Sequence, residues 1–267
     1  ILKQLSYMQD KKLGYKKENI IMLPLDANTR KAFGQLTAEF MRTGDVVAVG
    51  RATESPTRIQ GGYGFNIEGR NENDRMTLTA VAADTGFVTS LGMEIIEGRN
   101  FNDADLKRRD ADTTYAFIVN ESLVKTLLMD PATAVGKRAN VSGRQGEIVG
   151  VVRDFHFSSM HKTIGPLVIF NQEDYNHIFV KVKSDNITRT IARMKAISNE
   201  LVPQRPFEYQ FLDGQYQKLY SSEMRMGTIF TIFATLAIVI ACMGLLGLVS
   251  FSAAQKTKEI GIRKVMG

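Results

Sequence analysis

The chain contains, at residues 228–251, the sequence TIFTIFATLAIVIACMGLLGLVSF, which lies within a stretch from Met226 to Gln255 that has no charged side chain. A helix needs roughly 20 apolar residues to cross the hydrocarbon core of a bilayer. A buried core helix is the alternative, but such helices are usually shorter and tolerate a charge at the rim. This segment is apolar all round and is bounded by Arg225 and Lys256, so it predicts a transmembrane helix over residues 226–255.

The charges beside this segment predict its orientation. Within a dozen residues after it come four cations, Lys256, Lys258, Arg263 and Lys264. An excess of lysine and arginine marks a cytoplasmic flank. We therefore expect the large N-terminal part to lie outside the cytoplasm, in a protein of the cytoplasmic (inner) membrane whose surroundings include the lipid bilayer.

The net charge makes a nucleic-acid partner unexpected. Residues 226–267 hold those four cations and Glu259, which gives +3 of the +6 carried by the whole chain and leaves +3 for residues 1–225. That excess is dispersed, and no basic run is interleaved with aromatic residues. The sequence therefore predicts no nucleic-acid-binding surface.

The extracytoplasmic part is expected to fold without disulfides. The only cysteine, Cys242, lies in the middle of the apolar segment. A domain of about 200 residues is large enough to bury a core of its own. The expected stability therefore comes from packing alone.

The two stretches that border the extracytoplasmic part are amphipathic. The chain opens with ILKQLSYMQDKKLGY, in which Ile1, Leu5 and Met8 fall at helical spacing before Gly14. We expect residues 1–18 to be a stalk helix that follows an upstream membrane helix. Residues 213–225 precede the apolar segment, and we expect them to form a second stalk helix.

Strands and helices alternate at both ends of the extracytoplasmic part. Each end has a strand, a helix and a second strand: Asn19–Leu25, Arg30–Arg42 and Val46–Val49 near the start, and Ile178–Val182, Asn186–Val202 and Phe207–Phe211 near the end. These are two βαβ units, within residues 19–57 and 177–212. They predict one α/β domain that is split by an insertion.

The insertion, residues 58–176, is rich in glycine and other turn signals, which favours short strands. The strands and the one helix expected there are Thr77–Ala82, Ala116–Asn120, Glu147–Val152 and Leu167–Phe170, with the helix at Glu121–Met129. GGYGF at 61–65 indicates a mobile turn, because it lacks the Lys-Ser/Thr and the following helix of a phosphate loop. Asp103–Asp112 is expected to be a charged loop. The predicted fold class is therefore α+β, with a mostly β subdomain inserted into the α/β domain.

One cluster of polar residues resembles a metal site. Asp154, His156 and His161 lie close together in RDFHFSSMH, and two histidines with one carboxylate can hold a metal. Asp154 and His156 flank Phe155 in an alternating pattern, which is more typical of a polar strand edge. No G-x-S-x-G nucleophile motif occurs. The sequence therefore predicts no metal, no cofactor and no catalytic site.

The end of the chain resembles a known family. ACMGLLGLVSFSAAQKTKEIGIRKVMG, residues 241–267, is similar to the membrane segment and first cytoplasmic stretch of FtsX/MacB-type ABC transporter permeases, where a glycine-rich apolar helix is followed by (R/K)-x-(R/K)-E-I-G-I-R-(K/R)-x-x-G. The matching residues here are Lys256, Lys258, Glu259, Ile260, Gly261, Ile262, Arg263, Lys264 and Gly267. LGYKKENIIMLPL, IIEGRNF, VNESLVKTL and VGVVRDFHFSSMHKTIGPLVIF resemble the extracytoplasmic core domain of the same family. The resemblance covers essentially the whole chain.

The resemblance implies a non-catalytic permease subunit, from the C-terminal half of a permease with two repeats. It implies three protein partners: a cytoplasmic ABC ATPase that hydrolyses ATP, a second permease subunit that completes a dimer, and an envelope or outer-membrane protein. It also implies that the split α/β domain is porter-like. In the cytoplasmic segment 256–267, the residues implied to couple to the ATPase are Lys258, Glu259, Ile260, Gly261, Ile262, Arg263 and Lys264.

The chemistry of this tail is compatible with docking on another protein. In a helix, Glu259 and Arg263 stand four residues apart and can pair, while Ile260 and Ile262 offer apolar contact. Gly261 permits close approach or a bend. For the lysines alone, setting the topology is the simpler interpretation.

The main alternative is a membrane-anchored extracytoplasmic ligand-sensor domain of a signalling receptor. Such a receptor is expected to continue into a signalling linker with heptad repeats. EIGIRKVMG shows no start of a heptad pattern. The sequence therefore favours a permease that transmits ATP-driven motion for export or for mechanotransmission across the envelope.

Overall fold

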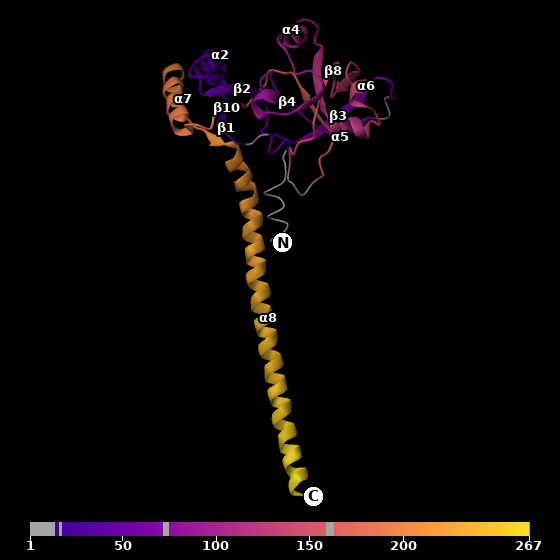
Figure 1. Ribbon diagram of the computed structural model, residues 1–267. Helices are drawn as coiled ribbons and strands as arrows, with labels where there is room; N and C mark the ends of the chain where they lie inside the picture. Colours follow the sequence, from indigo (N-terminus) through magenta and orange to yellow (C-terminus); the bar gives the residue numbers. More distant parts are fainter. Residues whose placement is uncertain (1–13, 16–17, 72–74, 159–162, 267) are drawn as a thin grey trace. The chain divides into compact units, whose positions relative to one another are not determined.

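The computed structural model describes residues 14–15, 18–71, 75–158 and 163–266, and Figure 1 shows their arrangement. The chain divides into two compact units, with a boundary between Tyr216 and Gln217. The unit up to Tyr216 holds two β-sheets and their helices. Among the described residues, the other unit consists of the remainder of one long helix.

A four-stranded antiparallel sheet combines strands from the two ends of the first unit, in the order β11-β1-β10-β2. The strands are β1 (Ile20–Pro24), β2 (Val46–Ala52), β10 (His177–Val182) and β11 (Gln210–Phe211). β1 and β2 are both antiparallel to β10, so they run parallel to each other with β10 between them. In the same way, β10 and β11 lie on either side of β1. The two βαβ units expected from the sequence therefore interlock, because each places a strand between the two strands of the other.

Two helices make the crossovers of this sheet, α2 (Ala27–Arg42) and α7 (Ile187–Leu201). Each begins at a side-chain cap: the Asp26 carboxylate accepts the Thr29 N–H at 2.8 Å, and the Asn186 side chain accepts the Arg189 N–H at 3.2 Å. Their apolar faces pack with the strands in one core that includes Ile21, Leu23, Leu36, Phe40, Val180 and Met194. Complete burial of each large side chain stabilises the fold by about 1.5–3 kcal/mol.

Seven strands of the insertion form a second sheet: β3 (Gly61–Ile67), β4 (Met76–Ala82), β5 (Ile95–Gly98), β6 (Tyr115–Asn120), β7 (Arg138–Val141), β8 (Arg144–Val152) and β9 (Leu167–Phe170). β7 pairs with both β3 and β8, so six strands close into a ring in the order β8-β6-β9-β4-β3-β7. β5 pairs with β8 in addition. Apolar side chains of the ring form a second core, which includes Phe65, Leu78, Phe117, Val141, Ile148 and Phe170.

Four short helices accompany the ring: α3 (Phe87–Leu91), α4 (Asp103–Asp112), α5 (Glu121–Thr126) and α6 (Pro131–Ala134). α5 and α6 join the ring core through Leu123, Val124 and Ala134. α3 packs instead against the four-stranded sheet, where the rings of Phe87 and Phe179 meet with centroids 5.5 Å apart. α3 therefore ties the insertion to the first sheet.

An ion pair also joins the two sheets. The Arg51 side chain, in β2, donates from Nε to the Asp84 carboxylate at 2.9 Å, and the Arg51 backbone N–H donates to the same carboxylate at 2.8 Å. Burial raises the pKa of Asp84 above its ordinary value, although the hydrogen bonds and charge of Arg51 act in the opposite direction. The Arg51 guanidinium also lies over the Phe33 ring, 3.8 Å from its centroid.

The structure corrects three expectations for the insertion. GGYGF belongs to β3 and pairs with β4 and β7, so it is not a mobile turn; alternate side chains, Phe65 and Ile67, are buried. Asp103–Asp112 is helix α4, which starts with a capping box between Asn102 and Asp105. Asp154 and His156 follow the end of β8 and do not lie in a strand. The stalk helix expected over residues 1–18 falls mostly outside the described residues.

One uninterrupted helix, α8, runs from Leu212 to Val265. It directly follows β11, and its 54 residues correspond to about 80 Å at 1.5 Å per residue. The sequence places a boundary between stalk and membrane segment at Met226, but the backbone remains helical there.

Candidate functional site: membrane helix, basic tail and an arginine-lined hollow

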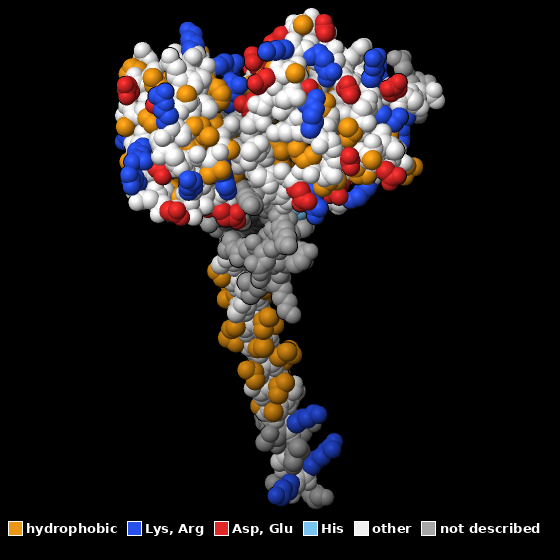
Figure 2. Space-filling model, turned by 45° about the horizontal axis from the view of Figure 1, so that its top comes forward, with side chains coloured by type: hydrophobic (Ala, Val, Ile, Leu, Met, Phe, Trp, Pro, Cys, Tyr) orange, Lys and Arg blue, Asp and Glu red, His pale blue; other side chains and the backbone are white. Residues whose placement is uncertain are grey.

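Within α8, the stretch Thr228–Lys264 is long and apolar enough to cross a membrane. Its most apolar part is not buried by any of the described residues, and large side chains such as Phe230 and Leu246 are more than half exposed. Figure 2 shows apolar side chains along the visible face of this helix and Lys and Arg gathered at its end. A continuous apolar surface of this length is typical of contact with lipid or with other membrane helices.

Inside the apolar stretch, the backbone of the helix accepts a hydrogen bond from a polar side chain. The Thr235 hydroxyl donates to the Thr231 carbonyl at 2.8 Å, one turn earlier. Such a bond removes an unpaired donor from a hydrocarbon environment. Thr235 is therefore compatible with a transmembrane position.

The seven residues that the sequence predicts for ATPase coupling all continue the backbone of α8. Gly261, Ile262, Arg263 and Lys264 are exposed. The side chains of Lys258, Glu259 and Ile260 are not described, so the expected pairing of Glu259 with Arg263 stays a prediction. A Cβ atom built on Gly261 would meet nothing within 4 Å, so packing of this chain on itself does not require glycine there.

The described residues around Asp154 form a structural cap. The Asp154 carboxylate accepts from the Ser122 N–H at 2.8 Å, the Ser122 hydroxyl at 2.7 Å and the Asn120 side-chain amide at 2.9 Å. It therefore holds the first turn of α5. His156 is buried, and His161 lies outside the described residues. In the part of the chain that is described, no three His, Cys, Asp or Glu residues are grouped as a metal site would need.

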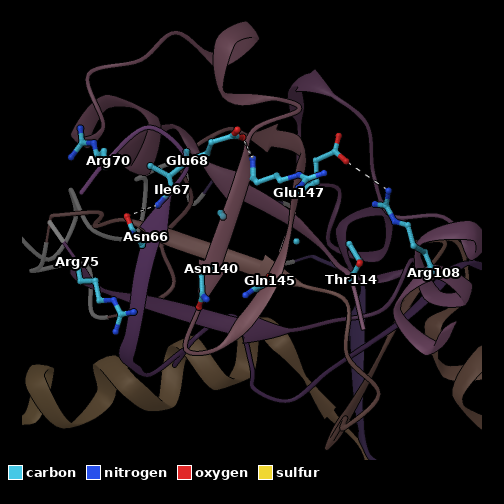
Figure 3. A pocket seen from close by; sticks show the side chains of 13 residues that line it. Asn66, Ile67, Glu68, Arg70, Arg75, Arg108, Thr114, Asn140, Gln145 and Glu147 are labelled. Atoms are coloured by element: carbon cyan, nitrogen blue, oxygen red, sulfur yellow. Dashed lines mark hydrogen bonds and ion pairs between the residues drawn. The ribbon is translucent and has the colours of Figure 1, made fainter. Parts of the chain in front are cut away.

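A hollow of about 580 Å³ lies over β3, β7 and β8 of the ring (Figure 3). Four arginines and two glutamates are among the residues that line it: Arg70, Arg75, Arg108, Arg138, Glu68 and Glu147. The two glutamates already have partners, because Glu68 accepts the Arg138 backbone N–H at 3.3 Å and Glu147 lies 3.7 Å from Arg108. Because four arginines face two glutamates, the hollow is more positive than negative and favours an anionic partner.

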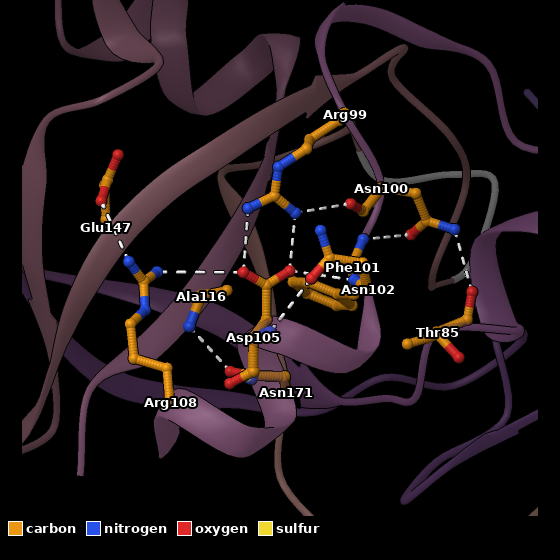
Figure 4. A network of polar contacts seen from close by, with 10 residues as sticks. All are labelled: Thr85, Arg99, Asn100, Phe101, Asn102, Asp105, Arg108, Ala116, Glu147 and Asn171. Atoms are coloured by element: carbon orange, nitrogen blue, oxygen red, sulfur yellow. Dashed lines mark hydrogen bonds and ion pairs between the residues drawn. The ribbon is translucent and has the colours of Figure 1, made fainter. Parts of the chain in front are cut away.

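A polar network centred on Asp105 lies beside this hollow (Figure 4). Arg99 donates to both carboxylate oxygens of Asp105, at 2.6 and 2.9 Å, and Arg108 lies between Asp105 and Glu147. Burial alone would raise the pKa of Asp105, but the hydrogen bonds from Arg99 and from the Asn102 backbone hold the pKa below its ordinary value. Asp105 is thus an ionised, bonded group that fixes α4 and positions Arg108.

Sequence reasoning missed this hollow because its residues come from separate parts of the chain. Arg70 and Arg75 lie around the link from β3 to β4, Arg108 lies in α4, and Arg138 lies in β7. No local motif connects them. The closure of the ring brings the hairpin of β7 and β8 next to β3.

These features define a class of protein: an α+β domain joined to a helix suited to a membrane, with a basic tail. The family described as the MacB-like periplasmic core domain matches residues 12–197, and the chain belongs to it. The chain is thus a MacB/FtsX-type ABC permease domain, as the resemblance implies. It is a membrane protein with an extracytoplasmic domain.

The curated proteins to which the chain is similar include a MacB protein and a permease. The chain is 23% identical over 250 residues to the macrolide export ATP-binding/permease protein MacB of Chromobacterium violaceum. The match covers 89% of this chain and 38% of that protein. The chain is 21% identical over 218 residues to an uncharacterized ABC transporter permease, YknZ, of Bacillus subtilis, covering 76% of this chain and 52% of that protein. The chain therefore spans about half or less of the length of these relatives.

A solved structure shares the fold. The periplasmic region of MacB from Actinobacillus actinomycetemcomitans matches with a TM-score of 0.51 at 14% identity, over 77% of this chain and 94% of that one. At this identity the likeness concerns the fold alone.

Proposed function

We propose that this chain is part of the permease of an ABC transporter and that α8 transmits ATP-driven movement to the extracytoplasmic domain. Membership of the MacB-like periplasmic core domain family is the observation that carries the proposal. The names of its relatives, an export ATP-binding/permease protein and an ABC transporter permease, support it. The permease itself catalyses no reaction; ATP is hydrolysed by a nucleotide-binding subunit or domain.

The continuous helix supports the mechanical part of this proposal. α8 has no break between Leu212, directly after the sheet, and Val265 in the basic tail. A break or flexible linker would absorb a displacement, whereas a helix passes on a shift or rotation of one end. The segments proposed for this path are stalk 213–225, membrane span 226–255 and coupling segment 256–267.

We further propose the partners and the divisions of the extracytoplasmic domain. The partners are a cytoplasmic ABC ATPase, a second permease subunit that completes a dimer, and an envelope or outer-membrane protein, at the cytoplasmic (inner) membrane. The α/β part, residues 19–57 and 177–212, is porter-like, and residues 58–176 form the inserted subdomain. The interlocked βαβ units of the four-stranded sheet support this division.

The coupling segment is tested in the full-length permease assembled with its ATPase. Gly261→Trp adds bulk at a position that faces empty space within this chain, so any steric block must come from a partner. Glu259→Arg places a like charge one turn before Arg263. We expect either change to lower permease-stimulated ATP hydrolysis about tenfold, the effect of losing roughly 1.4 kcal/mol of docking free energy.

Two controls separate docking from folding and topology. Gly261→Ala adds only a methyl group and favours helix, and Lys256→Gln removes one of four flanking cations. Both variants should keep normal ATP turnover and membrane insertion. Unchanged turnover in Gly261→Trp and Glu259→Arg would mean that the tail only sets topology, and the proposed coupling role of this segment would be wrong.

A further inference from the structure

Leu128 has an unusual backbone conformation. It follows α5 with φ = 56°, in the left-handed region, and the helix end is closed by bonds from the Leu128 N–H to the Lys125 carbonyl and from the Met129 N–H to the Val124 carbonyl. Glycine is the preferred residue at such a helix end, because a Cβ atom crowds the backbone there. A bulky apolar residue in this region is a genuine outlier.

Leu128 is also exposed to an unusual degree. Its exposed fraction is 91%, whereas no other large apolar residue described before α8 exceeds 52%. The other non-glycine residues described with positive φ are polar: Asn19, Thr113 and Ser142. Within this chain, Leu128 therefore combines backbone strain with a fully exposed apolar side chain, and a glycine would avoid both. Strained residues of this kind are concentrated at functional contacts.

The surroundings of Leu128 indicate the chemistry of its contact. Arg70 donates from Nη2 to the carbonyl of Leu127 at 2.8 Å and also lines the arginine-rich hollow. Lys125, one turn before Leu128, has a side chain that is 71% exposed, although its ammonium group lies 3.9 Å from the Asp154 carboxylate. Asp130 is the nearest exposed acid in the sequence. Leu128 thus projects next to a residue bonded to Arg70, and in the hollow that Arg70 lines cations outnumber anions.

We propose that Leu128, Lys125, Arg70 and the hollow form a docking surface for another protein of the envelope. The partner offers an apolar socket for the Leu128 side chain and carboxylates that face Arg70 and the hollow. An apolar anchor beside complementary charges is the usual composition of a specific interface. This inference rests on the envelope partner proposed above and names the surface and chemistry that would bind it, but it does not depend on coupling to the ATPase, which the tail variants test separately.

The test places a benzophenone-bearing amino acid at Thr126, an exposed position beside Leu128, in the full-length protein in intact cells. Illumination should give a protein adduct, and the cross-linked partner peptide should contain Asp or Glu. Arg70→Glu should lower the adduct at least tenfold. Reversing the charge of the partner carboxylate, by substitution with Arg, should restore the adduct in the Arg70→Glu background.

Leu128→Gly distinguishes docking from a structural role. In the purified full-length protein it should raise the midpoint of thermal unfolding by about 2–4 °C, because strain and an exposed apolar group are removed. In cells, the same substitution should lower the adduct at Thr126 at least tenfold. The matched control carries the benzophenone at Val47, another exposed apolar position, where Arg70→Glu should have no effect.

Three results would overturn the proposal. The first is an adduct at Thr126 with lipid only, which would assign the surface to a membrane. The second is the absence of any Arg70-dependent adduct. The third is a Leu128→Gly protein that is less stable or that keeps its adduct, since Leu128 would then serve the fold alone.

Discussion

Glycines 50 and 86 allow two backbone segments to meet where the sheets of the first unit join. A Cβ atom on Gly86 would lie 1.9 Å from the Val49 carbonyl oxygen, and one on Gly50 would lie 2.4 Å from the Gly86 backbone. No side-chain rotation can relieve such a contact, because both partners are backbone atoms. Within the same turn, the Gly86 N–H donates to the Asp84 carboxylate at 3.0 Å.

We expect Gly86→Ala to lower the free energy of unfolding of the extracytoplasmic domain by about 1–3 kcal/mol, the usual range for overpacking. Denaturant titration of the purified domain measures this change. The matched control is Gly64→Ala in β3, where a Cβ atom would meet nothing within 4 Å. That variant should stay within about 1 kcal/mol of the parent. Equal stability of the two variants would contradict the close approach.

Asp105 gives the domain a specific response to acid. Its pKa in the folded state is below the ordinary value, because the bonds from Arg99 and the Asn102 backbone outweigh the effect of burial. The carboxylate therefore stabilises the fold at any pH above about 4, the ordinary pKa of Asp. That contribution is lost as the pH falls through the lowered pKa of the folded state.

We expect Asp105→Asn to lower the free energy of unfolding at pH 7 by about 1–3 kcal/mol, the range for a hydrogen bond to a charged group. The gap between variant and parent should narrow as the pH falls below about 4. Denaturant titrations at several pH values measure it. Asp103→Asn, at an exposed position of the same helix, should show a small effect at every pH. A gap that does not change with pH would contradict an ionised Asp105.

Asn120, at the end of β6, makes four side-chain hydrogen bonds. Its side-chain oxygen accepts the N–H groups of Leu123 in α5 and Leu167 in β9, at 3.1 and 2.9 Å. Its amide group donates to Asp154 and to the Gly165 carbonyl, both at 2.9 Å. The residue is fully buried, so all of its hydrogen-bonding capacity is used inside the protein.

Asn120→Ala should therefore lower the free energy of unfolding by about 3 kcal/mol, because it leaves several buried polar groups without a partner. Denaturant titration and hydrogen exchange at the Leu167 amide measure the effect. Ser122→Ala, which removes one hydroxyl that contacts Asp154 and the Ile164 carbonyl, should lose less than half as much. Rapid exchange at Leu167 in the unmodified protein would contradict the proposed bond.

At the level of elements, the sequence predicts those with clear periodicity. The helices α2 and α7 and the strands β1, β2, β4, β6, β8, β9 and β10 are confirmed within a few residues. β3 is missed because three glycines hide the alternation that ends in Phe65 and Ile67. α4 is missed because it is almost wholly charged, and its start is defined by a capping box and not by an apolar face. Local signals therefore fail where tertiary pairing or capping decides the structure.

The arrangement of elements is less accessible from the sequence. The sequence predicts the two βαβ units. No local pattern indicates that each unit has a strand of the other unit between its own two strands. The same holds for the hollow and for Leu128, whose conformation depends on how α5 ends. The tail and the apolar segment can be predicted from the sequence, because length, charge and a contiguous motif identify them without tertiary contacts.

For the whole molecule, the topology is open to a direct test. In a Cys242→Ala background, a cysteine at the exposed position Asp112 should react with a membrane-impermeant thiol reagent in cells with a permeabilised outer membrane. A cysteine at Lys264 should react only after the inner membrane is opened, because the cations of the tail favour the cytoplasmic side. Asp105, which is buried, is unsuitable for labelling. The reverse pattern of labelling would contradict the orientation.

The interlocked sheet also sets the order in which the protein is completed during synthesis. Pro24 pairs with His177, about 150 residues further along the chain, whereas every strand of the ring lies between residues 61 and 170. Closing long loops costs entropy and slows folding, so we expect the ring to form first. The four-stranded sheet waits for β10 and β11, and α8 begins at the residue after β11. The domain therefore receives its last strand just as the ribosome delivers the helix that enters the bilayer.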